Sequence, residues 1–205
     1  MKNQNQMRSQ TFFTGGSSAP EILLEDEIFK LKSYVKSLSI RDYTMFSLAL
    51  ATGIRNHELV SLTIFCVAPF GTICDELELP AVIAKGGRGR SIPLHPDLKS
   101  DLIDFINWKD IHDEPLKAHS PLFCSKYRKK FLSERDFQRI TTIHSIASIG
   151  KSIHPHVFRH TFATRLLKKS NLAVVKAALG HVSIQTTQIY LHPSREDLTE
   201  AVHSL

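Results

Sequence analysis

Residues 42–52 form a nearly all-apolar stretch, DYTMFSLALAT, which is followed directly by Gly53. A helix that is apolar around most of its circumference has to be buried, so other elements must cover it. Glycine is the residue most often found in the left-handed conformation that ends a helix. The sequence therefore predicts a buried helix over 42–52 that ends at Gly53.

Further helices are indicated by caps, by terminal glycines and by apolar residues at helical spacing. Pro20 and the acidic residues after it favour a helix start, so the first helix is predicted to run to about Leu38. Asn56 is expected to cap a short helix, and Ser183 is expected to cap a last helix that carries Tyr190. The remaining helices are predicted at about 96–108, 134–149, 155–169 and 172–179.

Residues 64–94 have a different composition, with many β-branched side chains and the glycine-rich run KGGRGR. Such segments are typical of strands joined by turns. The stretch 77–94 is predicted to form a hairpin with Lys85 at its tip, although its first strand cannot be placed within 64–80. Because strands and helices do not alternate, the predicted fold is mainly α with a small antiparallel β-sheet (α+β).

The chain of 205 residues is long enough for one domain with its own core. It carries 26 lysines and arginines against 20 aspartates and glutamates, a net charge of +6, which permits a polyanionic partner without requiring one. No apolar run reaches the ~20 residues of a membrane helix, and the polar N-terminus has no features of a secretory signal. The odd number of cysteines, without a CxxC pair, fits a reduced cytoplasmic setting with buried or unreactive thiols.

Basic residues gather in two short runs, at residues 85–90 and 126–130. Short charged runs are often solvated turns, and this alternative applies to both. If the partner is DNA, positive charge in these runs suits its phosphate backbone. The residues expected to contact DNA are then Arg88, Arg90, Lys126, Arg128, Lys129 and Lys130.

The segment HPHVFRH, residues 154–160, combines residue types that suit phosphate chemistry. Pro155 near a helix start places His156 and Arg159 in the first turn and on one face, where free N–H groups attract phosphate. Their side chains can donate to the same phosphoryl oxygens. Two alternatives remain open. His156 and His160 have a spacing that suits zinc, although no nearby Cys, Asp or Glu completes the ligand set, and His160 is equally well explained as a core histidine.

Two other segments contain residues that suit catalysis. In TGIRNHEL, residues 52–59, Arg55 precedes Glu58 by three positions. This pair is either an ordinary surface pair or a guanidinium that the carboxylate directs at an anion. In GHVSIQTTQIY, residues 180–190, His181 is either a cation at a helix end or a catalytic group, and Tyr190 is either a packing residue or a nucleophile.

Four stretches, taken together and in this order, resemble the catalytic domain of the tyrosine recombinases, also called the phage integrase family. They are TGIRNHELVSL at 52–62, KGGRGRSIPL at 85–94, HPHVFRHTFATRLL at 154–167 and LGHVSIQTTQIYLH at 179–192. Each motif alone is weak evidence, whereas four in the family's order are specific. The resemblance extends over about residues 21–202.

The resemblance implies a complete catalytic set. Its members are Arg55, Lys85, His156, Arg159, His181 and the nucleophile Tyr190, with Glu58 at the family's supporting acidic position. It implies that the two arginines neutralise a phosphodiester as its pentacoordinate state forms, and that His156 accepts the tyrosine proton. Lys85 resembles the acid that protonates the departing 5′-hydroxyl. The implied intermediate is a 3′-phosphotyrosyl ester, formed without a metal or other cofactor because side chains supply the positive charge.

Most members of this family carry a separate helical DNA-clamping domain, and no domain of that size fits before residue 21. We therefore expect a flexible N-terminal arm over residues 1–20 and a catalytic domain over residues 21–205. The expected partners are double-stranded DNA, further copies of the chain in a tetramer on DNA, and accessory proteins. The expected location is the cytoplasm, at the nucleoid, without membrane association.

The leading hypothesis for function is a site-specific recombinase that integrates, inverts or resolves DNA. A non-catalytic DNA-binding regulator is one alternative, which would use the basic hairpin without performing chemistry. A topoisomerase-like relaxing enzyme is another, with the same chemistry and no pairing of two DNA sites. The complete set of catalytic residue types favours an enzyme over a regulator.

Overall fold

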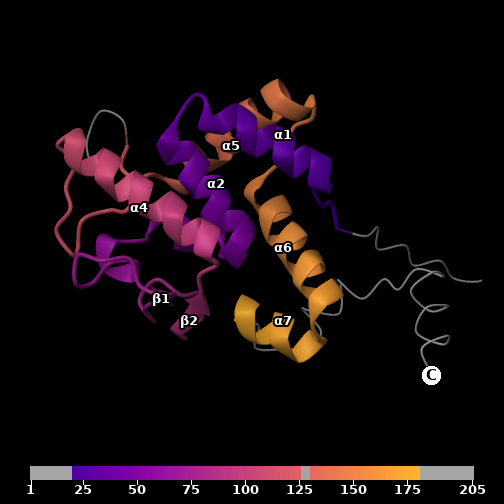
Figure 1. Cartoon of the computed structure of the whole chain (residues 1–205). Helices are drawn as coiled ribbons and strands as arrows, with labels where there is room; N and C mark the ends of the chain where they lie inside the picture. Colours follow the sequence, from indigo (N-terminus) through magenta and orange to yellow (C-terminus); the bar gives the residue numbers. More distant parts are fainter. Residues whose placement is uncertain (1–19, 126–129, 181–205) are drawn as a thin grey trace, which may run out of the picture.

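The computed structural model describes residues 20–125 and 130–180 (Figure 1). Residues 1–19, 126–129 and 181–205 lie outside the described residues, and with them nearly all of the predicted arm and the predicted last helix. The described elements, in chain order, are α1 (Glu25–Lys36), α2 (Ile40–Thr52), α3 (Asn56–Val60), the 3-10 helix η1 (Ile64–Cys66), β1 (Glu76–Leu79), β2 (Arg90–Pro93), α4 (Pro96–Ile111), α5 (Glu134–Ile149), α6 (Pro155–Lys169) and α7 (Leu172–Leu179).

Helix α2 lies at the centre of the fold and packs against α1, α4 and α6 (Figure 1). Ten of its 13 residues are buried, which confirms the predicted buried helix. It begins two residues earlier than predicted, because the Ser39 hydroxyl accepts a hydrogen bond from the backbone N–H of Asp42. It ends at Gly53, whose φ of 60° is the left-handed conformation expected of a terminal glycine.

The other helix bounds follow from local caps. Helix α1 begins at Glu25 rather than at the predicted Pro20, because the carboxylate of Glu27 accepts a 2.8 Å hydrogen bond from the N–H of Leu24. Helix α4 continues three residues beyond its predicted end, to Ile111. The bounds of α5, α6 and α7 agree with the predicted ones.

The hairpin is a two-stranded antiparallel sheet in which Glu76 lies opposite Pro93 and Leu79 opposite Arg90. One face is buried, through alternate residues such as Leu77, and the other is exposed. The strand that the sequence did not place is therefore β1, and the stretch before it begins with η1. The fold is mainly helical with a small antiparallel sheet, as predicted.

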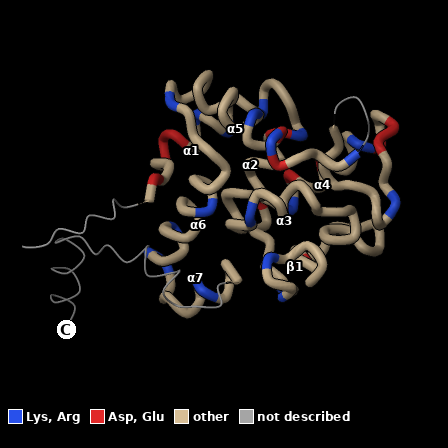
Figure 2. Tube along the Cα trace, turned by 180° about the vertical axis from the view of Figure 1, so that it is seen from behind, with Lys and Arg blue, Asp and Glu red and all other residues tan. Residues whose placement is uncertain are grey.

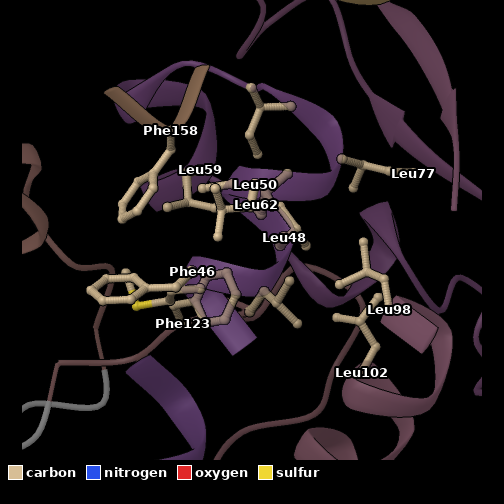
Figure 3. Close-up of a cluster of buried hydrophobic side chains, with 14 of the residues drawn as sticks. Phe46, Leu48, Leu50, Leu59, Leu62, Leu77, Leu98, Leu102, Phe123 and Phe158 are labelled. Carbon is tan, nitrogen blue, oxygen red and sulfur yellow. The ribbon is translucent and has the colours of Figure 1, made fainter. Parts of the chain in front are cut away.

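One large core joins every described element except α7, and Figure 3 shows part of it. Phe46 of α2 meets Phe158 of α6 with their ring centroids 5.0 Å apart. Leu59 of α3, Leu77 of β1 and Leu98 of α4 are buried in the same cluster. This packing fixes α3, the hairpin and α6 on α2, and these are the elements that carry the predicted site.

Helix α7 packs on the far half of α6 through a second, smaller cluster of Ala163, Val175 and Leu179. This cluster positions the end of α7, which lies two residues before His181 in the sequence. Within residues 20–125 and 130–180, no helix is both long enough and apolar enough to cross a membrane. Of the cysteines, Cys66 and Cys124 are buried, Cys74 is half-buried, and all three are free thiols.

Candidate active site

The end of α2 brings Arg55 to one edge of the core. Gly53 turns the chain in the left-handed conformation, and Arg55 then occupies the cap position of α3, which the sequence had assigned to Asn56. The carboxylate of Glu58 satisfies this end of the helix by accepting a 2.8 Å hydrogen bond from the Arg55 N–H. Arg55 also donates from Nη1 to Glu58 Oε1, at 3.2 Å. The pair is therefore not an ordinary surface pair, since the Glu58 side chain is fully buried and the Arg55 side chain is 16% exposed.

Glu58 is the hub of the site, because its carboxylate accepts five hydrogen bonds. Besides the two from Arg55, Arg90 donates from Nη1 to Oε1 at 3.0 Å and from Nη2 to Oε2 at 2.9 Å, and the backbone N–H of Lys85 donates to Oε1 at 3.4 Å. Burial alone would raise the pKa of Glu58, but these hydrogen bonds and the two guanidinium charges lower it to about 2. Glu58 is therefore ionised at neutral pH and gathers cationic groups from α3 and the hairpin.

Arg159 is almost completely buried near the start of α6. Its Nη1 donates to the carbonyl oxygen of Gly53 at 2.6 Å, and its Nη2 donates to the carbonyl oxygen of Leu179 at 2.9 Å. These acceptors lie at the C-terminal ends of α2 and α7, where backbone carbonyls lack helical partners and the helix dipole is negative. Arg159 thus ties together the chain segments that lead to Arg55 and to His181.

His156 stands exposed in the first turn of α6, one turn before Arg159. Its pKa is lowered from the ordinary value, first by desolvation and then by neighbouring positive charges. Those charges belong to His154, Arg159, Arg55 and Lys85. The lowered pKa favours the neutral ring of His156.

Lys85 lies in the connection between β1 and β2, directly before Gly86 and Gly87, which both have positive φ. Its side chain is exposed, while its backbone N–H is held by Glu58. The structure therefore brings five of the predicted site residues into one region. They are Arg55, Glu58, Lys85, His156 and Arg159.

Other predicted site residues are placed differently or not at all. His181 and Tyr190 lie outside the described residues, as do Lys126, Arg128 and Lys129. Arg88 and Lys130 are exposed, as a residue that contacts DNA has to be. Arg90, grouped with them in the sequence prediction, differs from them because its side chain is only 11% exposed and is paired with Glu58.

Basic groups predominate around the site. In Figure 2, lysines and arginines lie beside α3 and β1 and on α6 and α7, whereas acidic residues are seen on α1. The strand β1 itself carries Glu76 and Glu78, and the basic residues that follow it are Lys85 and Arg88 of the β1–β2 connection and Arg90 of β2. A histidine cluster at the start of α6 places the ring of His156 6.4 Å from that of His160. Within the described part of the chain, no group of three or more His, Cys, Asp or Glu residues is arranged to hold a metal ion.

Comparison with known proteins agrees with this fold. A family model described as the phage integrase family matches residues 21–197. Tyrosine recombinase XerD of Oceanobacillus iheyensis is 30% identical over 191 residues, a match that covers 90% of this chain and 62% of that protein. A tyrosine recombinase of Pseudothermotoga lettingae is 33% identical over 192 residues, covering 91% of this chain and 61% of that protein. The crystal structure of XerA recombinase matches with a TM-score of 0.74 and 27% identity, covering 95% of this chain and 66% of that one.

The fold is thus that of a tyrosine recombinase catalytic domain. Because the family model matches most of the sequence, the chain belongs to the phage integrase family. It spans about three fifths of the length of the curated relatives that it matches.

Proposed function

We propose that this protein is a site-specific DNA recombinase that cleaves and rejoins DNA strands through a covalent 3′-phosphotyrosyl intermediate on Tyr190. The observation that carries the proposal is geometric: Glu58 holds both the guanidinium of Arg55 and the backbone of Lys85, and Arg159 is bonded to Gly53, two residues before Arg55. A phosphodiester is anionic, and attack by an oxygen nucleophile adds negative charge to its non-bridging oxygens. Preorganised cationic donors offset this charge and typically contribute a few kcal/mol each.

In the proposed cleavage step, the Tyr190 oxygen attacks phosphorus and its proton passes to His156. The lowered pKa of His156 supports this role, because a base has to be neutral before it accepts a proton. The bond from phosphorus to the 5′-oxygen then breaks, and Lys85 protonates that oxygen. His181 donates to the phosphate, which is held between Arg55 and Arg159.

Rejoining reverses these proton transfers. The 5′-hydroxyl of a second strand attacks the phosphotyrosyl ester, which releases Tyr190 and restores a phosphodiester. One ester replaces another, so no external energy source is needed. In this scheme the side chains supply the positive charge, and neither a metal nor a cofactor takes part.

The remaining expectations about assembly form part of this proposal. The catalytic domain is taken to cover residues 21–205, to act on double-stranded DNA in the cytoplasm and to do so as a tetramer. Arg88 and the basic residues at 126–130 are taken to contact the DNA backbone. The names of the relatives, tyrosine recombinases, support strand exchange over the two alternatives, a DNA-binding regulator and a topoisomerase-like relaxing enzyme.

A suicide-substrate assay tests the proposal. The full chain is incubated with nicked duplexes tiled across the DNA that flanks its own gene, and with a randomised nicked library, so that cleavage traps a covalent adduct. We expect an adduct whose modified peptide contains Tyr190, and none with Tyr190→Phe although DNA binding is retained. Tyr34→Phe, a partly exposed tyrosine on α1, is the matched control and keeps the adduct. An adduct formed by Tyr190→Phe, or none by the unaltered chain, contradicts the proposal.

A further inference from the structure

We infer that Arg90 is a positioning residue for catalysis, which acts through Glu58 and the end of α7 rather than by contacting DNA. This inference rests on the proposed function, since it assigns Arg90 a part in assembling the same site. The sequence alone grouped Arg90 with the DNA-contacting residues of the basic hairpin, and its contacts in the fold are what separate it from them.

All three nitrogens of the Arg90 guanidinium donate hydrogen bonds to other groups of the protein. Nη1 and Nη2 form a two-pronged pair with the two oxygens of Glu58, at 3.0 and 2.9 Å. Nε donates to the carbonyl oxygen of Ala178 at 3.3 Å. A planar guanidinium fits both acceptors at once, which the single ammonium of a lysine does not.

These contacts join three elements of the site that are far apart in sequence. Arg90 itself begins β2, Glu58 lies in α3 and Ala178 lies in the last turn of α7. Gly180, the residue directly before His181, packs on the same side chain: a Cβ atom there would come within 3.1 Å of Arg90 Cδ. Arg90 therefore fixes the hairpin that carries Lys85, and the chain that leads to His181, against the Arg55–Glu58 pair.

Arg90 also affects how firmly Arg55 is held. Because Arg90 takes both oxygens of Glu58, Arg55 shares Oε1 with it through one side-chain hydrogen bond of 3.2 Å. Without Arg90, the buried carboxylate would have a single guanidinium as its charge partner. Arg55 would then be drawn further toward Glu58 and away from a phosphate, so the loss of Arg90 is expected to lower the cleavage rate more than the DNA affinity.

A double-mutant cycle tests this inference, with single-turnover adduct formation measured at saturating suicide duplex and DNA affinity measured separately. We expect Arg90→Met to slow cleavage by about 100-fold or more, by analogy with loss of one preorganised donor, with affinity changed by less than ~3-fold. In a Glu58→Gln background the same change is expected to slow cleavage by no more than ~3-fold, because the two residues act as one unit.

Two further arginines serve as comparators. Arg139→Met, on the exposed face of α5, is the neutral control and is expected to leave both measurements unchanged. Arg88→Met lies two positions from Arg90 and is expected to weaken DNA affinity equally in both backgrounds, as a direct contact does. The positioning role is overturned if Arg90→Met instead behaves like Arg88→Met. In that case Arg90→Met would weaken DNA affinity by the same factor in the unaltered chain and in Glu58→Gln.

Arg90→Lys covers the case in which Arg90→Met fails to fold, as judged by circular dichroism and thermal melting. It keeps the charge but loses the two-pronged geometry, and we expect a folded, DNA-binding protein with cleavage slowed at least ~10-fold. Full activity of Arg90→Lys overturns the inference while leaving the proposed function intact. Absence of any adduct with the unaltered chain overturns the proposed function, and the inference with it.

Discussion

Nη1 of Arg159 donates a 2.6 Å hydrogen bond to the carbonyl oxygen of Gly53, a residue 106 positions earlier in the chain. Gly53 ends α2 and lies two positions before Arg55, so this bond sets the spacing between the two arginines through the backbone. The ring of Phe162, one turn after Arg159 on α6, lies directly over Gly53. The close approach of α2 and α6 at this point is therefore a condition for the arrangement of the site.

Gly53→Ala is expected to destabilise the fold by roughly 2–4 kcal/mol. The new Cβ would come within 2.3 Å of Phe162 Cδ1, which adds overpacking to the cost of a left-handed alanine. Gly150→Ala is the matched control, because Gly150 also ends a helix with positive φ but has open space around its Cβ position. Urea denaturation of both variants measures the difference, and equal losses of stability would show that the contact with Phe162 contributes nothing.

Glu58→Gln is expected to lower stability most at neutral pH and least in acid. The pKa of Glu58 in the folded chain, about 2, lies below its ordinary value of 4.5, so the ionised carboxylate stabilises the fold above pH 4.5. That contribution, on the order of 3 kcal/mol, is lost as the pH falls toward 2. The measurement is the free energy of unfolding of both proteins from pH 7 to pH 2. Asp136→Asn, an exposed carboxylate in a similar helix cap, is expected to show a smaller effect. A constant difference between Glu58→Gln and the unaltered protein across this range contradicts the prediction.

The cleavage rate is expected to fall in acid with a midpoint below pH 6.5. His156 has to be neutral to accept the tyrosine proton, and its pKa is lowered from the ordinary value of 6.5, so it becomes protonated only under more acidic conditions. Single-turnover cleavage rates measured against pH show this fall in acid, called the acid limb. The variant His156→Gln is expected to react more slowly and to lack the acid limb. His95→Gln, an exposed histidine before α4, should leave the profile unchanged. A limb that persists in His156→Gln but disappears in His160→Gln would assign the base to His160.

Lys85→Ala is expected to slow cleavage by about 10²–10⁴-fold, the usual contribution of a general acid. A substrate with sulfur in place of the bridging 5′-oxygen should restore most of the rate, because a thiolate leaves without protonation. Lys30→Ala, an exposed lysine on α1, serves as the control and should cleave both substrates normally. If sulfur does not rescue Lys85→Ala, the main role of Lys85 is to contact DNA.

Much of the fold could be predicted from the sequence because its helices carry local signals. Pro155 marks the start of α6, and glycines end α2, α5 and α7, so the bounds of the last three described helices were predicted correctly. The predicted start of α1 was wrong because Pro20 indicated an earlier helix start. The helix is capped instead by the carboxylate of Glu27, its third residue. The hairpin was predicted over 77–94, but its first strand, β1, could not be placed, because the register of β1 is set by pairing with β2.

The candidate site was less accessible to sequence reasoning where its contacts are long-range. The Arg55–Glu58 pair has helical spacing, and so its two alternatives could be stated in advance. The bond from Arg90 to Glu58 joins residues 32 positions apart and depends on the hairpin register, for which the sequence carries no local signal. The carbonyl acceptors of Arg159 are equally invisible, because every residue type has a carbonyl group.

Main-chain acceptors have an evolutionary consequence. A substitution at position 179 exchanges a side chain but cannot delete the oxygen that Arg159 uses there. Mutational drift along this helix end therefore leaves the guanidinium anchored, provided that the local backbone path survives. Relatives that diverge widely in amino-acid identity can then retain the same placement of this cation, and a lineage would lose it chiefly through insertions or deletions that reroute the polypeptide.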